Sequence, residues 1–245
     1  MIKNIKLTFA YDGSKFKGIQ AQKNERTIQS ELEKAIYKLT GKSSRLILAG
    51  RTDAGVHAFG QVANFLTSAD IPGKTYMFKL AKYLPDSIIV LQSEEVSLDF
   101  HARFSAKNKR YQYIIYNDSF MHPAYNSIYC HVSYKLDLKA MTRACKYLEG
   151  RHDFKAFTKY EKKEKSTIRT ITRADIKRDG KLIIIEFEGE SFLYNQIRIM
   201  VGCLVDIGRQ HRSPDYVMDL FETKDRLKAG ITYPPSGLYL MEIGY

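Results

Sequence analysis

The residue types best suited to chemistry stand together in the segment Gly50–Ala58, which reads Gly-Arg-Thr-Asp-Ala-Gly-Val-His-Ala. Asp53 supplies a carboxylate that can act as a nucleophile or as a general base. Arg51 lies two residues before it, and a nearby cation favours the ionised carboxylate. An Asp in a loop more often caps a helix or closes a turn. The surroundings of Asp53 therefore decide between a catalytic and a structural role.

His57 follows Asp53 by four residues and is a second candidate base. A structural histidine that fixes the loop is the favoured interpretation, because the sequence offers no partners for a metal. The three cysteines, Cys130, Cys145 and Cys203, are far apart and form no Cys-x-x-Cys pair. This spacing favours neither a zinc site nor a disulfide framework. No second carboxylate lies close to Asp53 in the sequence, so a glycosidase-type pair is not indicated.

The elements on either side of Asp53 are predicted to hold it in a loop on a rigid base. The apolar run 46–49 predicts a strand that ends just before the glycine-flanked loop, and a second strand is expected at about 61–66. A helix is expected over about 27–40, with Thr27 as its N-cap and Gly41 at its C-terminal end. A carboxylate on such a loop is well placed to act on a ligand.

The remaining pattern indicates an α+β fold of two mixed α/β halves, residues 1–105 and 106–245, with antiparallel-rich sheets and helices on one face. Asp179-Gly180 predicts a hairpin turn. The other expected strands lie at about 5–11, 88–92, 109–116, 171–178, 181–187 and 238–244, and the other helices at about 74–83, 137–149 and 194–207. A last helix is expected to open at Ser213-Pro214, with Ser213 as its N-cap and Pro214 at the first helical position.

The composition favours a polyanionic partner. The chain of 245 residues has 39 Lys and Arg against 27 Asp and Glu, a net charge of +12, with 17 Tyr and 13 Phe interleaved. RNA recognition combines phosphate contacts with aromatic stacking. A basic RNA-binding cleft is therefore expected between the two halves. No apolar run is long enough to span a membrane, and the alternating start of the chain is unlike a signal peptide, so a cytoplasmic protein is expected. The mixed charges of Lys159–Lys165 predict a solvated loop.

The segment Gly50–Ala58 resembles the signature of the TruA family of tRNA pseudouridine synthases. The family usually carries Trp after Gly18, where this chain has Ile19, and other residues are common in place of Asn195-Gln196. These departures concern packing or RNA contact more than chemistry. Other segments resemble the remaining family motifs, in order along nearly the whole chain: Tyr11–Gly18, Phe100–Ala106, Lys109–Tyr113, His152–Phe154, Arg169–Ile171, Phe192–Gly202 and Pro235–Leu240.

The resemblance implies an isomerase that acts on the anticodon stem-loop of tRNA, at tRNA positions 38, 39 and 40. A uridine is flipped out, its glycosidic bond is cleaved, and the base is rejoined through carbon, without a metal or a cofactor. Asp53 matches the family's catalytic aspartate. The sequence leaves open whether Asp53 attacks C1′ of the sugar or removes a proton from C2′. The resemblance also implies a homodimer in which one tRNA touches both subunits.

The other site residues also follow from the resemblance. Tyr111 matches the tyrosine that stacks on the target base, and Arg198 matches the arginine that pairs with the catalytic aspartate. Arg51 is expected to help displace the base or to hold a nearby phosphate. Pattern alone favours Tyr111 as a core aromatic of a strand. Arg198 alone would be a surface cation, but its helix is too apolar to be freely solvated.

Two other classes of function remain open at this point. A catalytically silent RNA-binding protein needs the basic surface and the aromatic residues but not Asp53, Tyr111 and Arg198 together. A nuclease that uses Asp53 and His57 lacks visible metal ligands. Incubation with unmodified tRNA separates the three classes, since only the isomerase forms pseudouridine, only the nuclease breaks the strand, and the binding protein does neither.

Overall fold

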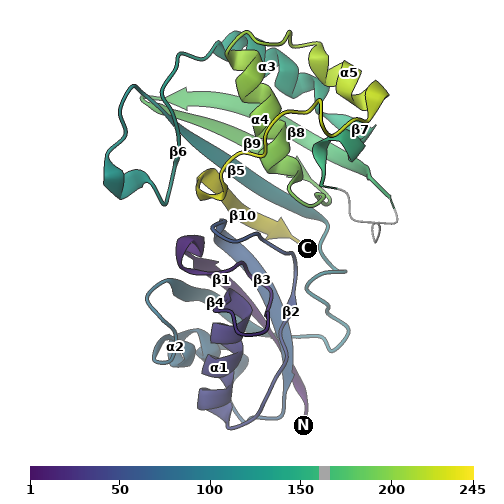
Figure 1. Ribbon diagram of the computed structural model, residues 1–245. Coiled ribbons are helices and arrows are strands. Elements are labelled where there is room, and N and C mark those ends of the chain that lie inside the picture. The colour runs from purple at the N-terminus through teal and green to yellow at the C-terminus, as the bar shows by residue number, and fades with distance from the viewer. Residues whose placement is uncertain (160–165) are drawn as a thin grey trace. The chain divides into compact units, whose positions relative to one another are not determined.

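The computed structural model describes residues 1–159 and 166–245 and divides the chain into two compact units (Figure 1). The first unit comprises Met1–Lys107 together with Tyr239–Tyr245, and the second comprises Asn108–Leu238. The charged segment Lys159–Lys165 lies outside the described residues from residue 160 onward.

The sheet of the first unit has β1 (Lys3–Tyr11) between β3 (His57–Thr67) and β4 (Ile88–Val96), with both pairings antiparallel. The short β2 (Ile47–Leu48) adds to β3, and β10 (Leu238–Gly244) pairs with the start of β3 in parallel. The helices α1 (Ile28–Thr40) and α2 (Tyr76–Ala81) lie on one face of this sheet (Figure 1).

Alternation of residue types in β1 explains which face is buried. Ile5, Leu7 and Phe9 are fully buried, whereas Lys6 and Thr8, which point to the opposite face, are only half-buried. The caps expected for α1 are confirmed. The Thr27 hydroxyl accepts a hydrogen bond from the Ser30 amide, and the Ser30 hydroxyl accepts one from the Thr27 amide.

The helix α1 ends at Gly41, which adopts a left-handed conformation with φ 68°. The strand expected at 61–66 is longer than predicted, since β3 begins at His57, directly after the Asp53 loop. Gly60 interrupts the alternating pattern in the sequence, but Ala58 before it and Gln61 after it still pair with β1, with a shift in register between them.

The sheet of the second unit runs in the order β5 (Asn108–Asn117), β9 (Leu182–Gly189), β8 (Ile168–Asp179), β7 (Gly150–Asp153), all antiparallel. β6 (Cys130–Val132) pairs with β5 in parallel. The expected hairpin is confirmed, with Gly180 at its turn. The helices are α3 (Leu138–Tyr147), α4 (Gln196–Gly208) and α5 (Tyr216–Thr223).

The prediction that Ser213 caps the last helix is wrong. The N-cap of α5 is Asp215, and Ser213 and Pro214 form a preceding turn whose carbonyls accept from the amides of Tyr216 and Val217. The Asp215 carboxylate instead accepts hydrogen bonds from Arg143 and Tyr147 of α3. This contact with a distant element cannot be seen in the local sequence.

Together the described elements form a mixed α/β protein with mostly antiparallel strands, as the sequence predicts. Single-turn 3₁₀ helices occur at Gly13–Lys15, Gly73–Thr75, Pro123–Tyr125, Phe154–Phe157 and Pro235–Gly237. Among residues 1–159 and 166–245, no helix has the length and apolar character needed to cross a membrane.

Candidate active site

The loop that carries Asp53 is held by hydrogen bonds within the loop and by hydrogen bonds to β3. The Ala49 amide donates to the Val62 carbonyl at 2.9 Å, and the Gln61 side-chain amide donates to the Gly50 carbonyl at 3.3 Å. Within the loop, the Val56 amide donates to the carbonyl of Asp53 at 3.2 Å. These bonds fix the backbone on both sides of the half-buried Asp53, so its carboxylate is carried by a rigid frame.

The N-terminal motif wraps around this loop from the other side. The Tyr11 hydroxyl lies 2.6 Å from the Thr52 hydroxyl, and both groups are buried. The Ile19 amide donates to the Thr52 carbonyl at 3.2 Å. Ile19 is fully buried, so the position at which the family usually carries Trp is a packing position in this chain. Gly18 has φ +87° and no side chain, which lets its backbone approach Thr52.

His57 is a structural residue of the same loop. Its side chain is 3% exposed and stacks on Tyr239 with ring centres 4.7 Å apart. Its Nδ1 atom accepts a hydrogen bond from the Gly13 amide at 3.2 Å, which places the proton of the neutral ring on Nε2. Asp12 also approaches Nδ1, at 3.4 Å, but one nitrogen cannot donate to Asp12 while it accepts from Gly13. The contact with the Gly13 amide is shorter than the contact with Asp12. A ring held in this way agrees with the interpretation of His57 as a structural residue.

Burial and hydrogen bonding set the ionisation of the groups beneath the loop. Burial raises the pKa of Tyr11 to about 12, despite its hydrogen bonds to Thr52 and Gln61, so the hydroxyl stays protonated. For Asp12, burial acts to raise the pKa, but the hydrogen bonds from the hydroxyl and amide of Ser14 outweigh it and the net pKa is lowered. Near neutral pH, the Tyr11 hydroxyl is therefore uncharged and the Asp12 carboxylate is negatively charged.

Arg198 lies on α4 of the second unit, and its guanidinium group is oriented by two oxygen atoms. Nε donates to the Tyr233 carbonyl at 2.7 Å, and a terminal nitrogen donates to the Asn195 side-chain oxygen at 2.9 Å. Asn195 is the N-cap of α4 and has φ 59°, a left-handed conformation that Asn tolerates better than most residues. The Asn at this departure from the family pattern therefore serves the positioning of Arg198.

Tyr111 lies on β5 of the second unit and is only 7% exposed. Its ring meets the edge of Phe192 at 5.2 Å between centres, in a T-shaped arrangement. Arg51 is exposed, on the first unit. Asp53 and Arg51 thus belong to one unit and Tyr111 and Arg198 to the other, and their meeting at one site stays a prediction.

Comparison with known proteins supplies the class of reaction. A family model described as tRNA pseudouridine synthase matches residues 7–105 and 144–245. A protein of Acetivibrio thermocellus named tRNA pseudouridine synthase A is 45% identical over 244 residues, and one of Thermoanaerobacter sp. with the same name is 46% identical, each over the full length of both chains. The chain belongs to the tRNA pseudouridine synthase family. It is therefore an enzyme that isomerises uridine in tRNA.

A solved structure of an archaeal box H/ACA sRNP Nop10–Cbf5 complex is also similar to this pseudouridine synthase. It shares 10% sequence identity and a TM-score of 0.37, and the match covers 82% of this chain and 53% of that chain.

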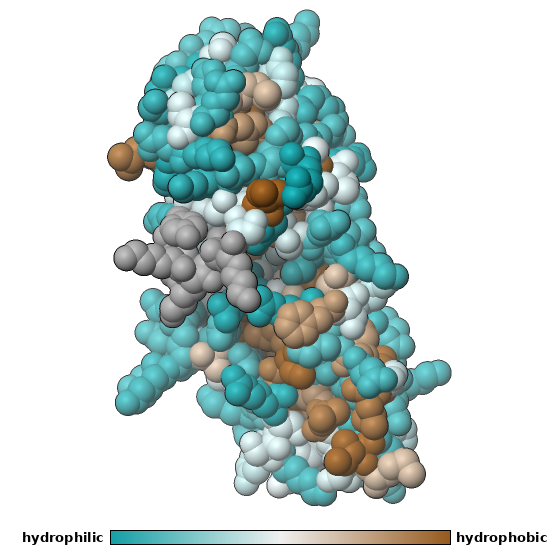
Figure 2. Space-filling view, turned by 90° about the vertical axis from the view of Figure 1, so that its right-hand side faces the viewer, coloured by the Kyte–Doolittle hydropathy of each residue, from teal (hydrophilic) through white to brown (hydrophobic). Residues whose placement is uncertain are grey.

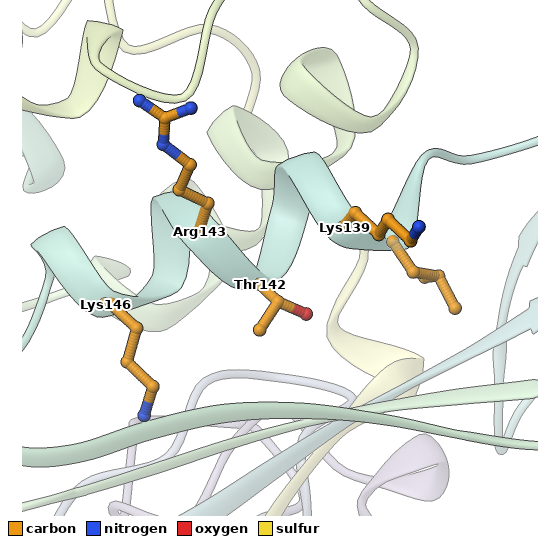
Figure 3. A pocket seen from close by; sticks show the side chains of 5 residues that line it. Lys139, Thr142, Arg143 and Lys146 are labelled. Carbon is orange, nitrogen blue, oxygen red and sulfur yellow. The ribbon is translucent and has the colours of Figure 1, made fainter.

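The second unit of the synthase also has a hollow on the surface of α3, lined by Leu138, Lys139, Thr142, Arg143 and Lys146 (Figure 3). Its lining has no carboxylate, thiol or imidazole, so this hollow is no candidate for the isomerisation itself. Among the described residues, no group of three or more His, Cys, Asp or Glu side chains is arranged to hold a metal ion.

Sequence reasoning missed the residues that hold the loop of the synthase. Tyr11, Gly13 and Thr52 make contacts with partners 41 to 44 positions away in the chain. The sequence does contain a signal for these residues, because Tyr11–Gly18 is one of the segments that resemble the family motifs. The spacing alone gave no indication that this motif lies against the Asp53 loop.

Proposed function

We propose that Asp53 is the catalytic carboxylate of this pseudouridine synthase and that its targets are uridines in the anticodon arm, at tRNA positions 38, 39 and 40. The observation that carries the proposal is the frame around Asp53. Tyr11, Gly13 and Ile19 all contact the loop that contains it, and these contacts restrain the backbone that carries the carboxylate. A preorganised carboxylate is what a reaction at a single sugar carbon requires.

The reaction exchanges one bond of the sugar for another. The bond from C1′ to a ring nitrogen of uracil breaks, and a bond from the same C1′ to a ring carbon forms. That carbon loses a proton and the freed nitrogen gains one, so the product is an isomer of the substrate. In this proposal Asp53 either attacks C1′ or takes a proton from C2′, and both roles need its ionised form.

The remaining roles are proposed from the family motifs and from the local geometry. Arg198, held by Asn195 and the Tyr233 carbonyl, pairs with Asp53 in this proposal. Tyr111 presents an aromatic ring to the flipped uracil. Arg51, which is exposed beside Asp53, helps to displace the base or holds a phosphate. The proposal also includes a homodimer in which one tRNA contacts both subunits, and a cytoplasmic location.

Substitution of Asp53 tests the proposal. Asp53→Asn and Asp53→Ala should form no pseudouridine in unmodified tRNA, because the carboxylate that acts on the sugar is lost, while their affinity for tRNA stays within a few-fold of the wild type. Mapping of pseudouridine along the tRNA tests the positions, and filter binding tests the affinity. Measurable turnover by Asp53→Ala would contradict the assignment of Asp53 as the catalytic carboxylate. Strand breaks in place of pseudouridine would favour a nuclease.

A further inference from the structure

The segment His101–Ser105 forms a closed turn at the surface of the first unit. The Ser105 amide donates to the His101 carbonyl at 2.9 Å, and the His101 amide donates to the Ser105 hydroxyl oxygen at 3.2 Å. The His101 Nδ1 atom accepts hydrogen bonds from the amides of Arg103 and Phe104, at 3.2 and 3.3 Å. The segment belongs to a motif to which the proposed reaction assigns no role, yet its backbone is tightly fixed.

The middle of this turn is anchored in the sheet. Ala102 is fully buried, its amide donates to the Asn64 side-chain oxygen at 2.9 Å, and its carbonyl accepts from the Tyr245 hydroxyl at 2.8 Å. Asn64 of β3 in turn donates to Asn4 of β1, and both asparagines are 1% exposed. Buried polar groups that satisfy one another in this way make a rigid support.

The anchored turn displays an aromatic ring beside a cation. Phe104 is 77% exposed, one face of its ring stacks on His101 at 4.3 Å between centres, and the Arg103 guanidinium carbon lies 5.7 Å from its ring centre. Hydrophobic side chains also gather elsewhere on the first unit (Figure 2), and Tyr37, Phe59 and Phe78 are exposed aromatic residues of the same unit. Of these four exposed rings, Phe104 is the one over which a cation lies among the contacts of the described residues.

We propose that Phe104 stacks on an unpaired nucleobase of the tRNA substrate, that Arg103 contacts the adjoining phosphate, and that His101 is a positioning residue for the ring. The ligand needs a flat aromatic face and a negative charge close to it, and a nucleotide supplies both. The inference rests on tRNA as the substrate and does not depend on the role of Asp53.

A single tryptophan reports directly on this contact, because the chain has no Trp of its own. In Phe104→Trp, we expect addition of unmodified tRNA to quench the fluorescence, since stacking on a base brings the indole against a nucleobase. The matched control is Phe120→Trp, because Phe120 is 86% exposed, lies on the second unit and has no place in the proposed contact. Its fluorescence should change much less.

Two results would overturn the inference. One is an unchanged or equal response of the two tryptophan variants to tRNA. The other is a change in the emission of Phe104→Trp with protein concentration in the absence of RNA, which would identify a protein as the occupant of this surface.

Affinity measurements separate stacking from mere hydrophobicity. We expect Phe104→Ala and Phe104→Leu to weaken tRNA binding by about 5- to 150-fold, the range for loss of one base–aromatic stack, while Phe104→Tyr retains wild-type binding. If Phe104→Leu binds as well as the wild type, the ring has no stacking role. The same affinities can be measured in the Asp53→Ala background, so that the test of Phe104 does not depend on whether Asp53 is the catalytic group.

The role of His101 has a distinct signature. His101→Ala should raise KM for tRNA and leave kcat near the wild-type value, because it loosens the turn without touching the reacting atoms. In the double variant with Phe104→Ala, removal of His101 should add little further loss. A fully additive loss would show that His101 does not act through Phe104.

Discussion

At the scale of single residues, the Asp53 loop depends on a buried pair of hydroxyl groups. Tyr11 and Thr52 lie 2.6 Å apart, out of contact with water. Tyr11→Phe should lower the free energy of unfolding by about 1–2 kcal/mol, because the Thr52 hydroxyl stays buried and loses this partner. It should also lower kcat more than affinity for tRNA, since the loop moves but the RNA-binding surface does not. Urea unfolding and single-turnover pseudouridine formation measure the two effects.

The double variant Tyr11→Phe/Thr52→Val provides the control for that prediction. Removal of both hydroxyls leaves no buried polar group without a partner, so stability should recover toward the wild type, while the activity stays low because the loop has still lost its link. Equal destabilisation in the single and double variants would contradict the role given to this pair. The pair also shows the limit of sequence reasoning, since nothing local relates residues 11 and 52.

At the scale of elements, the turn at Gly13–Lys15 fits against the end of the Asp53 loop with no space for a side chain. A Cβ atom on Gly13 would lie 1.9 Å from the Val56 carbonyl oxygen. Gly13→Ala should therefore push the turn away from the loop, break the hydrogen bond to His57, and cost about 3 kcal/mol of stability. Loss of pseudouridine formation at a temperature where the variant is still folded, shown by circular dichroism, is the expected result.

Gly41→Ala is the matched control for this turn. Gly41 has φ +68° with no heavy atom within 4 Å of an added Cβ, so alanine brings about 1–2 kcal/mol of backbone strain but no clash, far from the loop. Activity per folded molecule should be unchanged. If Gly13→Ala and Gly41→Ala lose the same activity, the contact between the turn and the Asp53 loop does not contribute to catalysis.

The elements differ in how well the sequence predicts them. The cap at Thr27, the stop at Gly41 and the hairpin turn at Gly180 follow from local hydrogen bonding and backbone preference, and each is confirmed. The start of β3 and the cap of α5 were misplaced, since both depend on distant partners. The frame of Asp53 belongs to this second kind.

At the scale of the whole molecule, the last residues of the sequence, Tyr239–Tyr245, belong to the first unit and not to the second. Within Tyr239–Tyr245, Tyr239 and Leu240 pair with the start of β3, and the Tyr245 hydroxyl donates to the Ala102 carbonyl. An apolar run near the C-terminus predicts a strand but not its neighbour, because a parallel pairing of residues 182 positions apart leaves no local signal. The same strand supplies Tyr239, which stacks on His57, so the C-terminus contributes to the loop that the N-terminal motif also holds.

The net charge of +12 makes a prediction about the binding of tRNA as a whole. Each phosphate neutralised by Lys or Arg releases counterions, so the affinity should fall by about 100-fold or more between about 50 and 200 mM salt. Arg103→Ala should reduce the slope of log Kd against log salt by about one, because it removes one phosphate contact. Phe104→Ala should weaken binding at every salt concentration without changing that slope, because stacking releases no ions. An equal slope for Arg103→Ala and the wild type would argue that Arg103 makes no phosphate contact.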